Sequence, residues 1–189
     1  MRVGVLALQG AFAEHVAKLK ACGIDAFEIR QLSDISRSFD GIVLPGGEST
    51  VMKKLLHELG LFKPIKKLIS EGLPVLATCA GMILLAKELE GGESSCFGTM
   101  DVTVKRNAYG RQPGSFRCVD KFNGVFVEMP FIRAPYVTKA GKGVDILSVH
   151  ENRIVAIRQK NQIAAAFHPE LTDNDTVYKY FVGIMEARR

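Results

Sequence analysis

The pattern of apolar and polar positions in the first half of the chain predicts strands that alternate with helices. Four short apolar runs are typical of strands buried on both faces of a parallel sheet: residues 3–8, 26–29, 41–44 and 74–78. Between the first two runs, Phe12, Val16 and Leu19 recur at helical spacing, and Gly23 follows as the expected C-cap. This alternation with short connections predicts a three-layer α/β sandwich, in which a mixed, mostly parallel sheet carries helices on both faces.

Further helices are expected from residue 50, over residues 62–71, after Cys79 as far as Leu89, and over residues 175–187. From about residue 97 the pattern changes to strand-like segments without helices between them, which predicts antiparallel hairpins: residues 100–105, 124–128, 145–149, 153–158 and 163–167. Asn152-Arg153 is the expected tight turn between two of these segments. The chain has no internal repeat, low-complexity tract or linker, so we expect residues 1–189 to form a single domain.

Composition and charge exclude several classes of function. The net charge of +5 is mild and the chain has no Trp, whereas nucleic-acid binding favours a dense basic stripe with interleaved aromatic residues. No apolar run approaches the roughly 20 residues needed to span a membrane. The four cysteines are scattered and form no CxxC pair, which argues against a disulfide framework and against a zinc site. We therefore expect a cytoplasmic protein without metal, membrane or nucleic-acid partner.

Cys79 is the first candidate for catalytic chemistry because it lies where a strand turns sharply into a helix. Its neighbours Ala77, Ala80 and Gly81 are small, as a tight strand-to-helix turn requires. The start of a helix offers free backbone N–H groups and a positive dipole end, which stabilise a thiolate. The Ala80 N–H is also a candidate oxyanion donor. Although free cysteines are often simply buried, this context favours a nucleophile.

His168 and Glu170 are the expected partners of this thiol. His168 ends an apolar run, and the following Pro169 restricts the backbone on both sides of it. Residues two apart on an extended chain project to one side, so Glu170 can orient the imidazole of His168. Two other histidines, His15 and His57, lie in predicted helices, where a surface or a satisfied core role suits them.

The segment PGGEST, residues 45–50, leaves a strand at its carboxyl end, where open α/β sheets bind their ligands. The two glycines allow close approach of a substrate, and the Gly47 N–H is a candidate second oxyanion donor. The segment lacks the Gly-Lys-Ser/Thr of a P-loop. Ser49 or Thr50 is also expected to cap the next helix.

PGGES, TCAG and FHPE in this order resemble the triad glutamine amidotransferases of class I type. More narrowly, LALQG, LPGGEST, ATCAG, KRNAYGRQ, FIRAP and FHPELT together resemble the glutaminase subunits of pyridoxal 5′-phosphate synthases over residues 3–173. This resemblance implies hydrolysis of L-glutamine by a Cys79–His168–Glu170 triad, without a cofactor. It also implies that the ammonia passes to a separate barrel-shaped synthase subunit that makes pyridoxal 5′-phosphate.

The resemblance also assigns glutamine contacts, which are Gly47, Glu48, Ser49, Arg106, Ile132 and Arg133. A cation suits the α-carboxylate of glutamine, and an acid or a carbonyl suits its α-ammonium group. We further expect docking of the synthase to be sensed by residues 8–11, with Gln9 and Gly10, because this segment leaves the first strand at the same sheet edge as the glycine loop. Three alternatives remain: an amidotransferase subunit of another pathway, a stand-alone cysteine hydrolase of this fold, and a non-catalytic module.

Overall fold

The computed structural model describes residues 1–93, 95–106 and 115–188. The helices and strands, in chain order, are β1 (Arg2–Leu6), α1 (Phe12–Ala21), β2 (Asp25–Ile29), the 3₁₀ helix η1 (Leu32–Ser36), β3 (Gly41–Leu44), α2 (Ser49–Glu58), α3 (Phe62–Ser70), β4 (Val75–Thr78), α4 (Ala80–Leu85), β5 (Ala86–Leu89), β6 (Met100–Lys105), β7 (Ser115–Phe122), β8 (Val125–Ile132), β9 (Tyr136–Ala140), β10 (Asp145–His150), β11 (Arg153–Gln159), β12 (Gln162–Ala165), the 3₁₀ helix η2 (Pro169–Leu171) and α5 (Thr176–Glu186).

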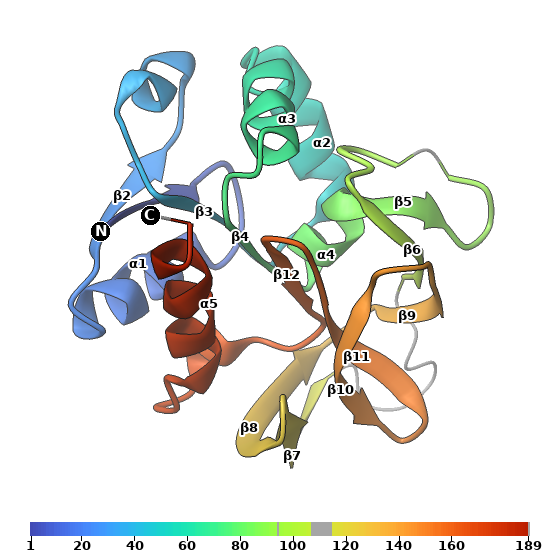
Figure 1. The fold of residues 1–189 in the computed structure, drawn as a ribbon. Helices are drawn as coiled ribbons and strands as arrows, with labels where there is room; N and C mark the ends of the chain where they lie inside the picture. Colours follow the sequence, from blue (N-terminus) through green and yellow to red (C-terminus); the bar gives the residue numbers. More distant parts are fainter. Residues whose placement is uncertain (94, 107–114, 189) are drawn as a thin grey trace.

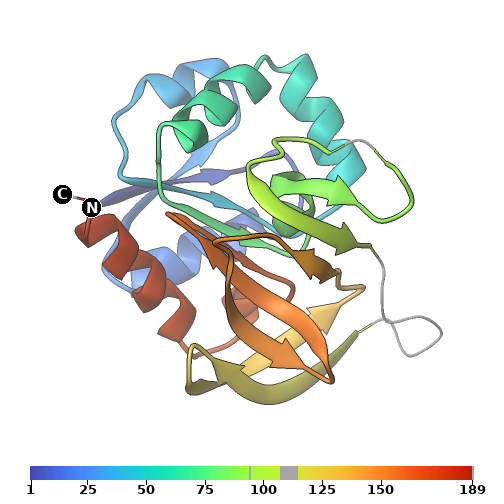
Figure 2. The ribbon, with the colours of Figure 1, turned by 45° about the vertical axis from the view of Figure 1, so that its right-hand side comes forward.

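One half of the main sheet is parallel, in the order β2-β1-β3-β4-β12. Strands β3, β4 and β12 are buried at every position, as their continuous apolar sequences require. Helices α2 and α3 cover one face of this half, and α1 and α5 cover the other (Figures 1 and 2). The predicted three-layer α/β sandwich is therefore confirmed.

The other half of the main sheet continues through β11, β9, β6 and β5, with β10 paired to β11. Hairpins join β10 to β11 and β11 to β12, as the sequence predicts, and β7 and β8 form a separate two-stranded sheet. The turn between β10 and β11 lies at Glu151-Asn152, one residue earlier than expected, because both residues adopt the positive φ angles that this hairpin needs.

Helix α4 and strands β5, β7 and β9 differ from the sequence-based predictions. The helix after Cys79 ends at Leu85, and Ala86–Leu89 is a strand, β5, rather than a continuation of the helix. Ala86 and Leu89 are buried with two exposed residues between them, a spacing that also suits a helix, and pairing with β6 decides between the two. Strands β7 and β9 were not predicted, since their mixed polar sequences give little apolar alternation.

The parallel arrangement brings the candidate site residues together at one edge of the sheet. Strands β1, β3, β4 and β12 run in the same direction, so their carboxyl ends meet there. The segments that follow these four ends carry Gln9, Gly47, Cys79 and His168, respectively. This is the edge at which open α/β sheets bind ligands.

Candidate active site

Cys79 occupies a strained turn between β4 and α4. Its φ of 46° and ψ of −102° are unusual for a residue with a side chain, and such strain costs roughly 1–3 kcal/mol. The Cys79 N–H donates to the Ala165 carbonyl of β12 at 2.8 Å, which fixes the turn against the neighbouring strand. A Cβ on Gly81 would lie 2.2 Å from the Leu44 carbonyl oxygen, so only glycine allows the helix to start this close to β3. The fold thus holds the thiol at the carboxyl edge of the sheet.

His168 and Glu170 form a tight, buried pair. The His168 Nδ1 lies 2.6 Å from Glu170 Oε1, and both residues are buried. The His168 backbone N–H donates to the Pro130 carbonyl at 2.9 Å, and the short helix η2 turns Glu170 back toward the imidazole. Burial by itself would raise the pKa of Glu170, but its electrostatic interactions with His15 and His168 and its hydrogen bond with His168 outweigh burial and lower that pKa. Glu170 is therefore a carboxylate.

The side chains of Cys79 and His168 both lie against the Gly46 backbone, and the Cys79 sulfur also faces the Ile132 carbonyl at 3.8 Å. Burial lowers the pKa of His168, but its hydrogen bonds with Cys79 and Glu170, together with their negative charges, raise that pKa to about 10. An imidazolium at neutral pH stabilises a thiolate beside it. The Gly46 backbone lies against both side chains, since a Cβ there would be 2.4 Å from His168 Cε1 and 3.3 Å from Cys79 Cβ. The arrangement can supply a nucleophile, a base and an orienting carboxylate.

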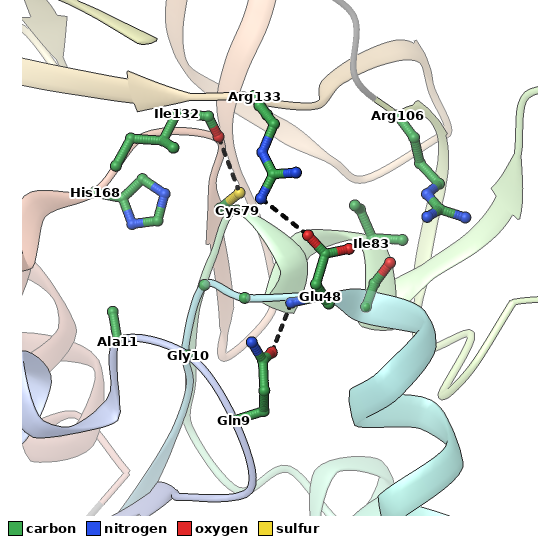
Figure 3. Close-up of a pocket in the computed structure, with 13 residues that line it drawn as sticks. Gln9, Gly10, Ala11, Glu48, Cys79, Ile83, Arg106, Ile132, Arg133 and His168 are labelled. Atoms are coloured by element: carbon green, nitrogen blue, oxygen red, sulfur yellow. Dashed lines mark hydrogen bonds and ion pairs between the residues drawn. The ribbon is translucent and has the colours of Figure 1, made fainter. Parts of the chain in front are cut away.

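The glycine loop after β3 is held by the segment after β1. The Ala11 N–H donates to the Gly46 carbonyl at 3.1 Å, and the Glu48 N–H donates to Gln9 Oε1 at 2.6 Å (Figure 3). Gly10 has a φ of +91°, and a Cβ on it would meet the Gly46 oxygen at 1.8 Å. The loop therefore cannot move independently of residues 8–11.

Helix α2 begins at Ser49, and its N-cap is Glu48, which makes no side-chain capping bond. The expected capping role of Ser49 or Thr50 is thus wrong. The reason is that the backbone at Glu48 is already extended and its N–H is bonded to Gln9, so the helix starts one residue earlier.

These segments enclose a pocket of about 220 Å³. It is lined by Gln9, Gly10, Ala11, Gly46, Gly47, Glu48, Ser49, Cys79, Ile83, Arg106, Ile132, Arg133 and His168 (Figure 3). The lining includes every predicted site residue except Glu170, which lies behind His168, and Ala80, which starts helix α4. The volume is below the roughly 300–1,000 Å³ of drug-sized ligand sites and suits a single small polar molecule.

Charged side chains at the rim are paired in this structure. Arg133 Nη2 lies 3.0 Å from Glu48 Oε1, and the Arg106 guanidinium pairs with Glu93. The Ile132 carbonyl faces the sulfur of Cys79 at 3.8 Å. The remainder of the KRNAYGRQ motif, residues 107–112, lies outside the described residues.

Sequence reasoning missed the residues behind the triad. His15 is completely buried and lies 3.4 Å from Glu170 Oε2, with Thr78 and Tyr178 as its other polar neighbours. The sequence did indicate that His15 is buried, because residue 15 falls on the same helical face as the apolar residues Phe12 and Leu19. His15 thus has the core role, not the surface role.

In the part of the chain that the structure describes, the four cysteines are free thiols, and no group of three or more His, Cys, Asp or Glu side chains is arranged to hold a metal ion. Burial raises the pKa of Cys96 and of Cys118 to about 11, so these two thiols are poor nucleophiles. No helix among the described residues is long and apolar enough to cross a membrane.

Comparisons with known proteins agree with the resemblance that the motifs indicated. The model of the SNO glutamine amidotransferase family matches residues 5–187. Pyridoxal 5′-phosphate synthase subunit PdxT of Methanocorpusculum labreanum is 54% identical over 98% of both chains, and its namesake in Haemophilus influenzae is 50% identical over 99% of this chain and all of its own. A crystal structure described as a glutamine amidotransferase superposes with a TM-score of 0.91 at 40% identity, covering 97% of this chain and 98% of its own.

Proposed function

Because the chain belongs to the SNO glutamine amidotransferase family, we propose that it is the glutaminase subunit of a pyridoxal 5′-phosphate synthase. The observation that carries this proposal is the buried Cys79–His168–Glu170 arrangement at the edge of a pocket of about 220 Å³. The reaction is hydrolysis of L-glutamine to L-glutamate and ammonia. The buried, reduced thiol suits a cytoplasmic setting.

The three residues divide the chemistry among them. The Cys79 thiolate attacks the side-chain amide carbon of glutamine and forms a tetrahedral intermediate. The imidazolium of His168 then protonates the amine as the C–N bond breaks, which leaves a γ-glutamyl thioester and ammonia. His168 next takes a proton from water, which attacks the thioester. Collapse of this second tetrahedral intermediate breaks the C–S bond and restores the thiolate beside the imidazolium, and glutamate leaves with its carboxyl proton lost to solvent. Glu170 keeps the ring oriented and stabilises its cation throughout.

Backbone N–H groups stabilise the oxyanion of each tetrahedral intermediate. Ala80 is the first residue of α4, so the helix itself leaves its N–H unpaired beside the sulfur. Gly47 supplies the second N–H from the loop after β3. No metal or organic cofactor enters this half-reaction.

The rim residues select the amino-acid end of glutamine. The cations of Arg106 and Arg133 suit the α-carboxylate, whereas Glu48 and the Ile132 carbonyl suit the α-ammonium group. Because Glu48 and Arg133 pair with each other across the pocket, glutamine exchanges that ion pair for contacts of its own. Ser49 and the Gly47 backbone complete the binding site.

Docking of the synthase subunit acts through residues 8–11. The contacts of Gln9 with Glu48, and of Gly10 and Ala11 with Gly46, make the position of the Gly47 N–H depend on this segment. An incomplete oxyanion hole in the isolated subunit prevents wasteful hydrolysis, and restoring one such donor changes the rate by about 10²- to 10³-fold.

The decisive experiment is a glutaminase assay with and without the cognate synthase subunit. Activity should rise on its addition, and ammonia should support formation of pyridoxal 5′-phosphate from a pentose phosphate and a triose phosphate. A glutamine-analogue electrophile should label Cys79 and spare Cys22, Cys96 and Cys118. Cys79→Ser should abolish hydrolysis while binding to the synthase persists.

Glutamine turnover that is unaffected by the synthase subunit would instead indicate a stand-alone hydrolase. Activation by the synthase of another pathway, and not by this one, would indicate an amidotransferase with a different product. Labelling of another cysteine, with activity retained in Cys79→Ser, would refute the assignment of the nucleophile.

A further inference from the structure

One oxygen of the triad carboxylate has no hydrogen bond in the described part of the molecule. Glu170 Oε1 accepts from His168, but Oε2 is buried without a partner. A buried carboxylate oxygen left unpaired is costly. The polar atom that faces it is His15 Nε2, at 3.4 Å, and both side chains are fully buried.

His15 is held in place from two other elements. Its Nε2 lies 3.0 Å from Thr78 Oγ1, at the end of β4 and next to Cys79 in sequence. Its Nδ1 lies 2.8 Å from the hydroxyl of Tyr178, on helix α5. His15 itself comes from α1, so the imidazole joins both helices on one face of the sheet to the strand that carries the nucleophile.

These contacts determine which ring nitrogen carries the proton. Burial raises the pKa of Tyr178, so its hydroxyl stays protonated and can donate to Nδ1. The proton of a neutral ring then lies on Nε2, where it faces Thr78 Oγ1 and Glu170 Oε2. The opposite tautomer would direct a nitrogen lone pair at the carboxylate, which is repulsive.

The ring is neutral because burial lowers the pKa of His15 more than its charged neighbours raise it. Glu170 and Glu14 favour the cation, whereas burial and the positive His168 oppose it. A neutral donor has a functional advantage here. An uncharged N–H can orient a carboxylate without neutralising it, so the full negative charge of Glu170 would remain available to His168.

We propose that His15 is a positioning residue of the glutaminase site, whose Nε2–H, fixed by the hydroxyl of Tyr178, orients Glu170 through its second oxygen. The triad is thereby extended into the core by His15, Tyr178 and Thr78. The inference rests on the proposed function, since it concerns the orienting carboxylate of the same reaction. It explains why a polar, fully buried residue occupies the apolar face of α1.

The test compares His15→Leu, which removes the donor, with His15→Gln, which returns an N–H near the position of Nε2. With saturating synthase subunit, His15→Leu should lower kcat about 10- to 100-fold, with little change in KM, because loss of an orienting partner misplaces the group it supports. His15→Gln should recover most of kcat. Leu19→Ala, which loosens the same helix, is the matched control and should lower stability while kcat is retained.

A second readout does not depend on glutamine turnover. In protein with ¹⁵N-labelled histidine, the NMR titration midpoint of His168 should move to lower pH in His15→Leu, because a misplaced Glu170 supports the imidazolium less well. The midpoint should return in His15→Gln and stay unchanged in Leu19→Ala. Tyr178→Phe should shift the ¹⁵N signals of His15 away from those of a pure Nε2–H tautomer.

A folded His15→Leu variant with wild-type kcat and an unchanged His168 midpoint would overturn the proposal. If His15→Leu does not fold, unchanged His15 signals in Tyr178→Phe would overturn it equally. A wild-type protein that does not hydrolyse glutamine with the synthase subunit present would refute the proposed function, whereas the His168 titration would still decide the role of His15.

Discussion

Gly46→Ala is the substitution for which the structure gives the sharpest expectation. Gly46 has no positive φ, so its backbone accepts alanine without conformational strain. The added methyl group would, however, lie 2.4 Å from His168 Cε1 and 3.1 Å from its Nδ1. Ordinary contact begins near 3.4 Å, so the imidazole or the loop must move by about 1 Å.

A displacement of this size should lower both the catalytic rate and the free energy of unfolding, and the two effects can be measured separately. A misplacement of about 1 Å in a catalytic group costs roughly 100-fold in rate. If the loop moves instead, the N–H that we propose as the second oxyanion donor, that of Gly47, is displaced, with a loss of about 10²- to 10³-fold. Overpacking a filled site costs about 1–3 kcal/mol of stability. We therefore expect kcat to fall at least about 100-fold in a protein that still folds.

The assay is steady-state glutamine hydrolysis with saturating synthase subunit, together with urea unfolding of the isolated chain. Gly183→Ala is the matched control, because Gly183 lies within helix α5 and a Cβ there meets nothing within 4 Å. It should keep full activity and gain about 0.5–1 kcal/mol in the free energy of unfolding. A Gly46→Ala enzyme with kcat within about twofold of wild type would refute the packing argument.

Three further predictions use other parts of the site. His168→Asn should lower glutamine hydrolysis by at least about 10²- to 10⁴-fold, whereas His150→Asn, which alters a histidine paired with an aspartate outside the pocket, should leave it intact; equal losses would show that the wrong base was chosen. Gln9→Ala removes the acceptor of the Glu48 N–H and should weaken activation by the synthase by about tenfold, with less effect on basal activity, in a titration of rate against synthase concentration. Burial lowers the pKa of His15 below 6.5 in the folded state. As the pH falls below 6.5, His15 therefore binds a proton in the unfolded chain but not in the folded chain, and the folded state loses stability. Urea unfolding should show a steeper acid loss for wild type than for His15→Gln, by up to about 1.4 kcal/mol per pH unit, and parallel profiles would contradict a neutral His15.

The sequence by itself determined the features that depend on neighbouring residues. The apolar runs and helical spacings of the first half specify parallel strands covered by helices, because burial on both faces requires continuous apolar sequence. The small residues around Cys79 specify the strained turn, and the spacing of His168 and Glu170 specifies their pairing. Each of these features depends on residues that are close together in the sequence, so the local pattern is enough to predict it.

Only the tertiary structure decided which distant segments meet. Pairing of β4 with β12 places His168 beside Cys79, and no local pattern indicates that neighbour relation. Pairing with β6 likewise makes β5 a strand, although its spacing of buried residues also suits a helix. Strands of mixed polarity such as β7 and β9 owe their conformation to ladder partners more than to their own sequence.

The network behind the triad is the clearest case of this division. The sequence places His15 on the same helical face as Phe12 and Leu19, but it does not show which groups the buried imidazole meets. Its contacts come from β4, η2 and α5, which supply Thr78, Glu170 and Tyr178, all distant from residue 15 in the sequence. The charge and tautomer of a buried imidazole depend on the groups around it, and packing of the helices against the sheet brings those groups together.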